Sequence, residues 1–127
     1  MDTLGYFDSK GRPQIVIEVK CENIVKEYEA LVDSGADNSL LPKRAGLQLG
    51  LKLPSEASGY STGVGGRVPL KYVALEVKFG PEVLRLKFAW LYTCDDIPVI
   101  IGRKGIFNHF NVDFRQKENK IIFKRSK

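Results

Sequence analysis

The stretch ALVDSGADNSLLP, residues 30–42, places carboxylates at Asp33 and Asp37 between two apolar runs. Gly35 follows Asp33 by two residues and permits a tight turn, while Val32 indicates that a buried strand leads into that turn. The turn is therefore predicted to hold the Asp33 carboxylate at the edge of the core. A carboxylate placed there can serve as a general acid or base, although Asp-Ser-Gly triplets also occur in plain surface turns.

A second segment, IPVIIGRKGIF at residues 97–107, carries two branched apolar residues directly before a glycine. Ile100, Ile101 and Gly102 predict a strand end that can pack beneath the loop bearing Asp33. Neither the Asp-Ser-Gly triplet nor this segment is by itself specific for a catalytic site. Their occurrence in one chain favours a catalytic interpretation of the Asp33 carboxylate.

These segments, in this order along nearly the whole chain, resemble the retropepsin-like aspartic proteases of the small single-domain type found in retroviruses, retroelements and prokaryotes. The layout is most similar to that of the prokaryotic stand-alone members. The family's Asp-Thr/Ser-Gly-Ala motif is matched by Asp33, Ser34, Gly35 and Ala36. Its hydrophobic-hydrophobic-Gly element is matched by Ile100, Ile101 and Gly102, and the second Asp with its paired Arg by Asp37 and Arg103.

The resemblance implies an aspartic endopeptidase whose catalytic residue is Asp33. Two carboxylates that share one proton can activate a water and protonate the leaving amide, so no metal or other cofactor is expected. Because the chain contains one such loop, the resemblance implies a homodimer in which the Asp33 carboxylates of two subunits meet at a twofold axis. An acidic to mildly acidic activity optimum is expected from such a pair.

The other matched positions receive supporting roles from the same resemblance. Ser34, Gly35 and Ala36 support the active-site loop, with Ser34 tying the loops of the two subunits together. Gly102 and Arg103 give structural support, and Asp37, paired with Arg103, contacts the substrate backbone. For Ser34 and Asp37, stabilisation of the turn is the alternative interpretation.

A glycine-rich tip within residues 60–70 resembles the flap that closes over bound peptide in this family; it consists of Gly63, Val64, Gly65 and Gly66. Glycines allow a sharp reversal and close approach to a peptide backbone, but an ordinary mobile hairpin loop has the same composition. The candidate walls of the cleft are Val64, Ile100 and Ile101. They predict that a peptide or protein substrate carries apolar residues near the cleaved bond.

The elements that must position these residues are predicted to be mostly strands, over residues 14–19, 24–32 and 97–102 and in a last hairpin around residues 116–119. The positions of proline and glycine predict one short helix after residue 42. The segment RKGIFNHF predicts a second helical turn, which Gly105 makes short or irregular. We therefore expect one all-β domain over residues 1–127. The expected architecture is a retropepsin-like closed barrel or sandwich of hairpins, with one or two short helices and a glycine-rich flap hairpin.

Composition narrows the classes of protein further. The 127 residues are 43% hydrophobic and 28% charged, and no stretch reaches the roughly 18 apolar residues of a membrane span, so we expect a soluble domain. The start MDTLGYFDSK lacks the pattern of a secretory signal, which favours a cytoplasmic location. Cys21 and Cys94 are interpreted as packing residues, and with His109 as the one histidine a zinc site would lack ligands.

Two alternatives remain at this point. The fold could be retained as a peptide-binding or dimerisation module in which catalysis is weak or absent. The net charge of +5 and the basic end KENKIIFKRSK allow nucleic-acid binding, but we do not expect it because no basic stripe is interleaved with aromatic residues elsewhere.

Overall fold

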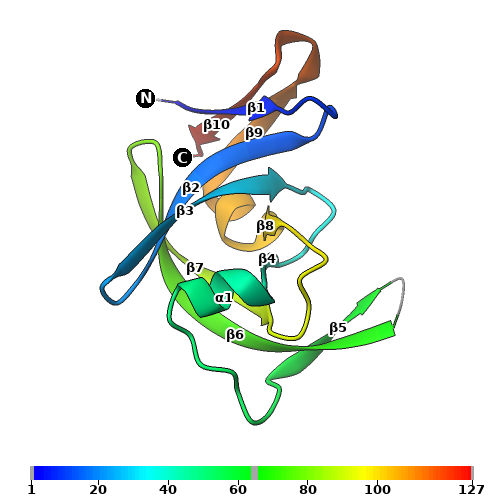
Figure 1. Cartoon of the computed structure of the whole chain (residues 1–127). Coiled ribbons are helices and arrows are strands. Elements are labelled where there is room, and N and C mark those ends of the chain that lie inside the picture. Colours follow the sequence, from blue (N-terminus) through cyan, green and yellow to red (C-terminus); the bar gives the residue numbers. More distant parts are fainter. Residues whose placement is uncertain (1, 64–65, 127) are drawn as a thin grey trace.

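The computed structural model describes residues 2–63 and 66–126, which form a mostly stranded fold (Figure 1). The strands are β1 (Thr3–Phe7), β2 (Pro13–Cys21), β3 (Ile24–Val32), β4 (Ser39–Pro42), β5 (Gly59–Gly63), β6 (Gly66–Phe79), β7 (Glu82–Leu91), β8 (Val99–Ile101), β9 (Phe110–Arg115) and β10 (Lys120–Arg125). The helical segments are α1 (Lys43–Gln48), the irregular turn η1 (Arg103–Phe107) and the 3-10 turn η2 (Gln116–Glu118). The prediction of an all-β fold with short helices is thereby confirmed.

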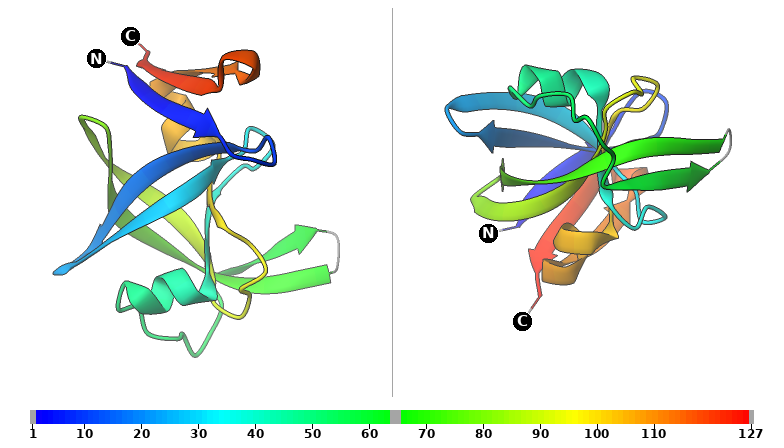
Figure 2. Two further views of the ribbon diagram at one scale, coloured as in Figure 1. Left: turned by 45° about the horizontal axis from the view of Figure 1, so that its top comes forward. Right: turned by 90° about the horizontal axis from the view of Figure 1, so that it is seen from below.

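Six of the strands close into a barrel. Around the ring they follow the order β2, β6, β7, β4, β8 and β3, and the pairing of β3 with β2 completes it. The closing contact between β2 and β6 is short, with Glu18 opposite Lys78 and Lys20 opposite Glu76. Figure 2 shows the barrel from two further sides, with α1 packed against its outside.

Inward-facing residues of the strands build the core as the two-residue period of a strand predicts. In β2 the side chains of Ile15, Ile17 and Val19 are buried, whereas those between them point toward solvent. The largest fully buried side chain is Trp90 on β7. Helix α1 approaches Trp90 so closely that a Cβ built on Gly46 would overlap the indole ring, which explains why this helix position is a glycine.

In the middle of the barrel wall, strands that are distant in the sequence lie side by side. Strand β8 runs parallel to β3, with Val32 opposite Ile101, and antiparallel to β4, with Leu40 opposite Ile100. Strand β4 in turn runs parallel to β7. The ends of β3 and β8 therefore lie next to each other, and the loop between β3 and β4 emerges at the same point.

Two outer parts extend this barrel. Strands β1, β10 and β9 continue the sheet beyond β2, and Phe79 of the barrel packs edge-on against Phe110 and Phe123, with ring centroids 5.2 and 5.6 Å away. The hairpin of β5 and β6 projects from the other side, at the right of Figure 1. Within residues 2–63 and 66–126, no helix has the length and apolar character that crossing a membrane requires.

The segment after β8 is not a regular helix, in agreement with the prediction that Gly105 would make it short or irregular. Lys104 has extended backbone angles and Gly105 has a φ of 98°, so η1 is bent within its first residues. A Cβ at position 105 would lie 2.7 Å from the Cδ2 atom of Leu86 on β7. Position 105 is therefore a glycine for two reasons: its φ is positive, and its backbone packs closely on the barrel wall.

Candidate active site

Asp33 stands directly after β3, on the loop that leads to β4. Its backbone N–H donates to the carbonyl oxygen of Ile101 over 2.9 Å, which continues the pairing of β3 with β8 by one residue. The N–H of Gly35 donates to Oδ1 of Asp33 over 2.9 Å, and the N–H of Ala36 to the Asp33 carbonyl over 3.2 Å. These bonds fix both the turn and the carboxylate within it. The carboxylate is half-buried, while Ser34 and Gly35 on the tip are exposed.

The residues that follow β8 hold the Asp33 loop through backbone hydrogen bonds. The N–H of Arg103 donates to the carbonyl oxygen of Ala36 over 2.8 Å, and that of Lys104 to the carbonyl oxygen of Asp37 over 2.9 Å. A Cβ built on Gly102 would lie 2.6 Å from the carbonyl carbon of Asn38 and 2.8 Å from the carbonyl oxygen of Ala36. Position 102 is therefore a glycine because the backbones of two loops meet there.

Ser39 is a further residue of the site that the sequence analysis missed. Its side chain is fully buried at the start of β4, and its Oγ accepts a hydrogen bond of 3.1 Å from the N–H of Gly102. The available signal was a serine directly before the apolar run Leu-Leu-Pro, because a hydroxyl that is buried with such a run normally has a specific partner.

We expect Ser39→Ala to lower the free energy of unfolding by about 1–3 kcal/mol, because the N–H of Gly102 would then be buried without a partner. Urea unfolding would measure the change, with Ser9→Ala at an exposed turn position as the matched control. Equal stability of the two variants would contradict the role assigned to the Ser39 hydroxyl.

Asp37 and Arg103 form the ion pair that the sequence predicted. An Nη2–H of Arg103 donates to Oδ1 of Asp37, and the side chains keep 57% and 65% of their surface exposed, Arg103 first. Ion pairs this exposed contribute little to stability. The backbone bonds of both residues, rather than their charges, therefore hold the two loops together, and both side chains remain accessible beside Asp33.

Asp33 and Ser34 line an open hollow of about 430 Å³ together with Leu31, Val32, Pro13, Arg12 and Phe114. Phe114 lies on β9, the last strand of the sheet, and is 40% exposed. Arg12 is paired with Asp8, whose carboxylate accepts hydrogen bonds from the backbone N–H groups of Lys10 and Arg12 and, over 3.2 Å, from the Arg12 Nε. The Arg12 N–H contributes most to lowering the pKa of Asp8.

The comparisons with known proteins agree with this geometry. The family model described as aspartyl protease matches residues 17–104, which include both the Asp33 loop and the strand end at Gly102. The chain belongs to the aspartyl protease family. A comparison with curated protein sequences finds no match.

Solved structures of aspartyl proteases share the fold of the chain. A retropepsin-like aspartic protease from Rickettsia conorii superposes with a TM-score of 0.77 at 16% identity, over 97% of this chain and 89% of that one. The EIAV protease, solved with the inhibitor HBY-793, superposes with a TM-score of 0.60 at 21% identity, over 76% of this chain and 86% of that one. This aspartyl protease family member therefore has a retropepsin-like fold, as its motifs suggested.

The predicted flap lies on the hairpin of β5 and β6. Gly63 is paired with Gly66 across this hairpin, and Val64 and Gly65 lie outside the described residues, so their predicted roles stay predictions. Near the outer end of this hairpin the Arg67 guanidinium lies over the ring of Tyr60, 4.0 Å from its centroid, and this contact stabilises the pairing of β5 with β6.

Of the predicted apolar walls, Ile100 and Ile101 face opposite sides of β8. Ile101 is 1% exposed and packs in the barrel core, so the expectation that its side chain contacts substrate is corrected. Neighbouring residues of a strand point to opposite faces, and one of the two had to be a core residue. Ile100, which is 8% exposed and lies outside that core cluster, keeps its predicted role.

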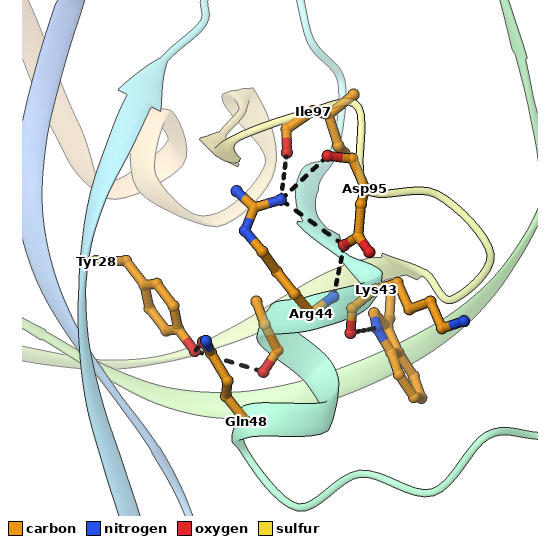
Figure 3. A network of polar contacts seen from close by, with 8 residues as sticks. Tyr28, Lys43, Arg44, Gln48, Asp95 and Ile97 are labelled. Atoms are coloured by element: carbon orange, nitrogen blue, oxygen red, sulfur yellow. Dashed lines mark hydrogen bonds and ion pairs between the residues drawn. The ribbon is translucent and has the colours of Figure 1, made fainter.

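A polar network fixes the loop that enters β8 (Figure 3). The N–H of Arg44 donates to Oδ1 of Asp95 over 2.7 Å, and its Nη1 donates to the carbonyl oxygens of Asp95 and Ile97 over 3.1 and 3.3 Å. On the same helix Gln48 accepts a hydrogen bond of 2.9 Å from the Tyr28 hydroxyl, whose pKa is raised by burial. No recognisable sequence motif contains Arg44, so its role was not predicted. This role depends on contacts between segments that are far apart in the sequence.

In the part of the chain that the structure describes, no group of three His, Cys, Asp or Glu side chains is placed to hold a metal ion. Asp95 and Asp96, the second acidic pair of the sequence, are exposed on the loop before β8. Asp95 accepts a hydrogen bond from the N–H of Arg44 there, so its carboxylate helps to fix this loop.

Proposed function

We propose that this chain is an aspartic endopeptidase that acts as a homodimer, with a catalytic pair made of Asp33 from each subunit. The observation that carries the proposal is the Asp33 carboxylate, which is oriented by the Gly35 N–H on a loop anchored to β8 and which faces an open hollow. Membership of the aspartyl protease family supports it. One such loop occurs in the sequence, so a second copy of the chain must supply the other carboxylate.

In the proposed reaction the two carboxylates divide the acid and base roles. One is ionised and removes a proton from a water, whose oxygen attacks the peptide carbonyl carbon, while the other is protonated and donates to the carbonyl oxygen. In the collapse of the tetrahedral intermediate, the carboxyl that took the proton from water donates it to the amide nitrogen as the C–N bond breaks, and the other carboxylate takes back a proton from a hydroxyl of the intermediate. The Gly35 N–H keeps Oδ1 of Asp33 fixed through these steps and so reduces the reorganisation that the reaction needs.

The substrate is proposed to be an extended peptide that lies between the Asp33 loop and the β5–β6 hairpin. Strand-like binding uses backbone hydrogen bonds for affinity and alternate side chains for specificity. Ile100 would provide an apolar surface for the residues next to the cleaved bond, and Asp37, exposed beside Asp33, would contact the peptide backbone.

The hollow beside Asp33 and the free edge of β9 support association with a second copy. Strand β9 is the last of the sheet order, so its outer backbone groups have no neighbouring strand in the described structure. Phe114 on this strand exposes 40% of its surface into the hollow that Asp33 and Ser34 also line. Burial of this face by a second subunit would cover Phe114 and bring a second Asp33 loop to the first.

We therefore expect Phe114→Asp to raise the dissociation constant of the dimer at least about tenfold, equivalent to about 1.4 kcal/mol, because a charge would replace the apolar contact. Sedimentation over a range of protein concentrations would measure it. Val83→Asp, at a 54% exposed position of β7 remote from Asp33, is the matched control and is expected to dimerise like the wild type. A wild type that remains monomeric while it cleaves peptides would contradict the homodimer.

The test of the proposed function is cleavage of a diverse peptide mixture across roughly pH 4 to 7, the range where a carboxyl pair can exchange its shared proton. Cleavage next to apolar residues that depends on Asp33 would support the endopeptidase. A folded and dimeric protein that binds peptides but cleaves none would favour a peptide-binding module instead.

A further inference from the structure

A cavity of about 260 Å³ lies between the β6–β7 sheet and the turn that follows β8. Three cationic side chains line it, namely Arg85 and Lys87 from β7 and Lys104 from the turn, together with Asn38. Cavities that enclose whole small molecules measure roughly 300–1,000 Å³, so this one has the size for a single side chain or a small anion.

The charges around the cavity are unbalanced. No carboxylate lines it, and none of its three cations takes part in the ion pairs found within the described residues. Of the carboxylates on adjoining segments, Glu76 lies opposite Arg85 across the β6–β7 ladder, and Asp37 is bound to Arg103. The cavity therefore presents a net positive charge to an incoming group.

The walls of the cavity are fixed by packing. Lys87 lies over the ring of Tyr72, with its Nζ 4.3 Å from the centroid, and Tyr72 also lines the cavity. Leu86 and Gly105 close it on the barrel side, where a Cβ at Gly105 would collide with Leu86. The backbone that carries the three cations is thus fixed in a β-strand and in a packed turn, while their side chains are exposed to solvent.

The cavity lies at the end of a series of backbone hydrogen bonds that starts at the active-site loop; this series is called the track below. From Asp33, which is bonded to Ile101, the two segments run side by side through the pairs of Ala36 with Arg103 and of Asp37 with Lys104. Asn38 and Lys104, at the end of this track, form part of the cavity wall. An extended peptide that followed this track from Asp33 would advance about 3.3 Å per residue, which would bring a side chain a few residues from the cleaved bond to the cavity.

We infer that this cavity is a specificity site that takes an acidic side chain, Asp or Glu, of the peptide substrate. The inference rests on the proposed function for its substrate but adds a preference that the aspartic chemistry does not require. In a homodimer the cavity occurs twice, related by the twofold axis. An acidic residue is therefore favoured at matching distances on both sides of the cleaved bond.

The experiment compares peptides with the same apolar cleavage sequence and a single Glu or Gln placed two to five residues from the cleaved bond. For the wild type, kcat/KM and binding affinity at the best position are expected to be about three- to tenfold higher with Glu than with Gln, the range for partly exposed charge pairs. Raising the salt concentration should reduce this ratio.

The variant with Lys87→Glu and Lys104→Glu is expected to reverse the preference, so that a Lys peptide is bound and cleaved better than the Glu peptide. Lys26→Glu, at an exposed position of β3, is the matched control and should keep the preference of the wild type. Circular dichroism would confirm that both variants fold.

The outcomes separate this inference from the proposed function because binding is measured alongside cleavage. Cleavage without any difference between Glu and Gln peptides at any position would overturn the specificity site and leave the endopeptidase intact. Tighter binding of the Glu peptide without any cleavage would support the site and overturn the endopeptidase. Equal binding of all peptides without cleavage would overturn both.

Discussion

Replacing Asp33 by Asn is expected to reduce kcat/KM for peptide cleavage at least about 100-fold, since a positioned acid or base contributes roughly 10²–10⁴. Asn has nearly the shape of Asp, and its amide oxygen can still accept the hydrogen bond from the Gly35 N–H, so the turn should keep its geometry. The amide cannot take a proton from water. In a homodimer both members of the pair change at once, which leaves no carboxylate at the site.

Steady-state kinetics would measure this loss, and thermal unfolding would show whether the variant is folded. The matched control is Asp96→Asn, an exposed carboxylate on the loop before β8, which is expected to keep the activity of the wild type. If Asp33→Asn remained active, or if Asp96→Asn were inactive, the catalytic carboxylate would have to lie elsewhere.

Gly102→Ala is expected to lower the free energy of unfolding by about 3 kcal/mol and to abolish activity with it, because overpacking costs most where the neighbours cannot move. The new methyl group would meet backbone atoms of Asn38 and Ala36, not the ends of flexible side chains. The loop bearing Asp33 and the turn after β8 would have to separate. That separation breaks the hydrogen bonds that Arg103 and Lys104 donate to this loop.

Urea unfolding would measure the change against Gly59→Ala on β5, where a new Cβ would have ordinary contacts of 3.6 Å or more. The control variant is expected to lose less than about 1 kcal/mol, because its new methyl group overlaps no neighbouring atom. A similar small loss in Gly102→Ala would show that the two loops are free to move apart.

The parts of the site that could be predicted from the sequence are those where the backbone requires a particular residue. Asp33 on a tight turn and Gly102 at a strand end both leave a local pattern, and Asp37 and Arg103 were identified by the resemblance to the retropepsin-like proteases. The barrel strands likewise follow their two-residue alternation.

The parts that could not be predicted depend on contacts between distant segments. The choice between Ile100 and Ile101 as a wall requires the face of β8 that points into the barrel, which its three residues, all apolar, do not reveal. Strand β4 is too short for a pattern of its own, and its parallel pairing with β7 arises from packing. Arg44 fixes the loop before β8 only because α1 packs beside that loop in the fold.

The pairing of β3 with β8 also determines when the site can form during synthesis of the chain. The bonds that shape the Asp33 turn come from Ile101, Arg103 and Lys104, which the ribosome adds about 70 residues after Asp33. Until those residues have emerged, the turn has its local hydrogen bonds from Gly35 and Ala36 but lacks its anchor on β8 and on the residues that follow β8. The order of synthesis therefore implies that the proposed hydrolytic activity begins only after β8 and the turn that follows it have been added to the nascent chain.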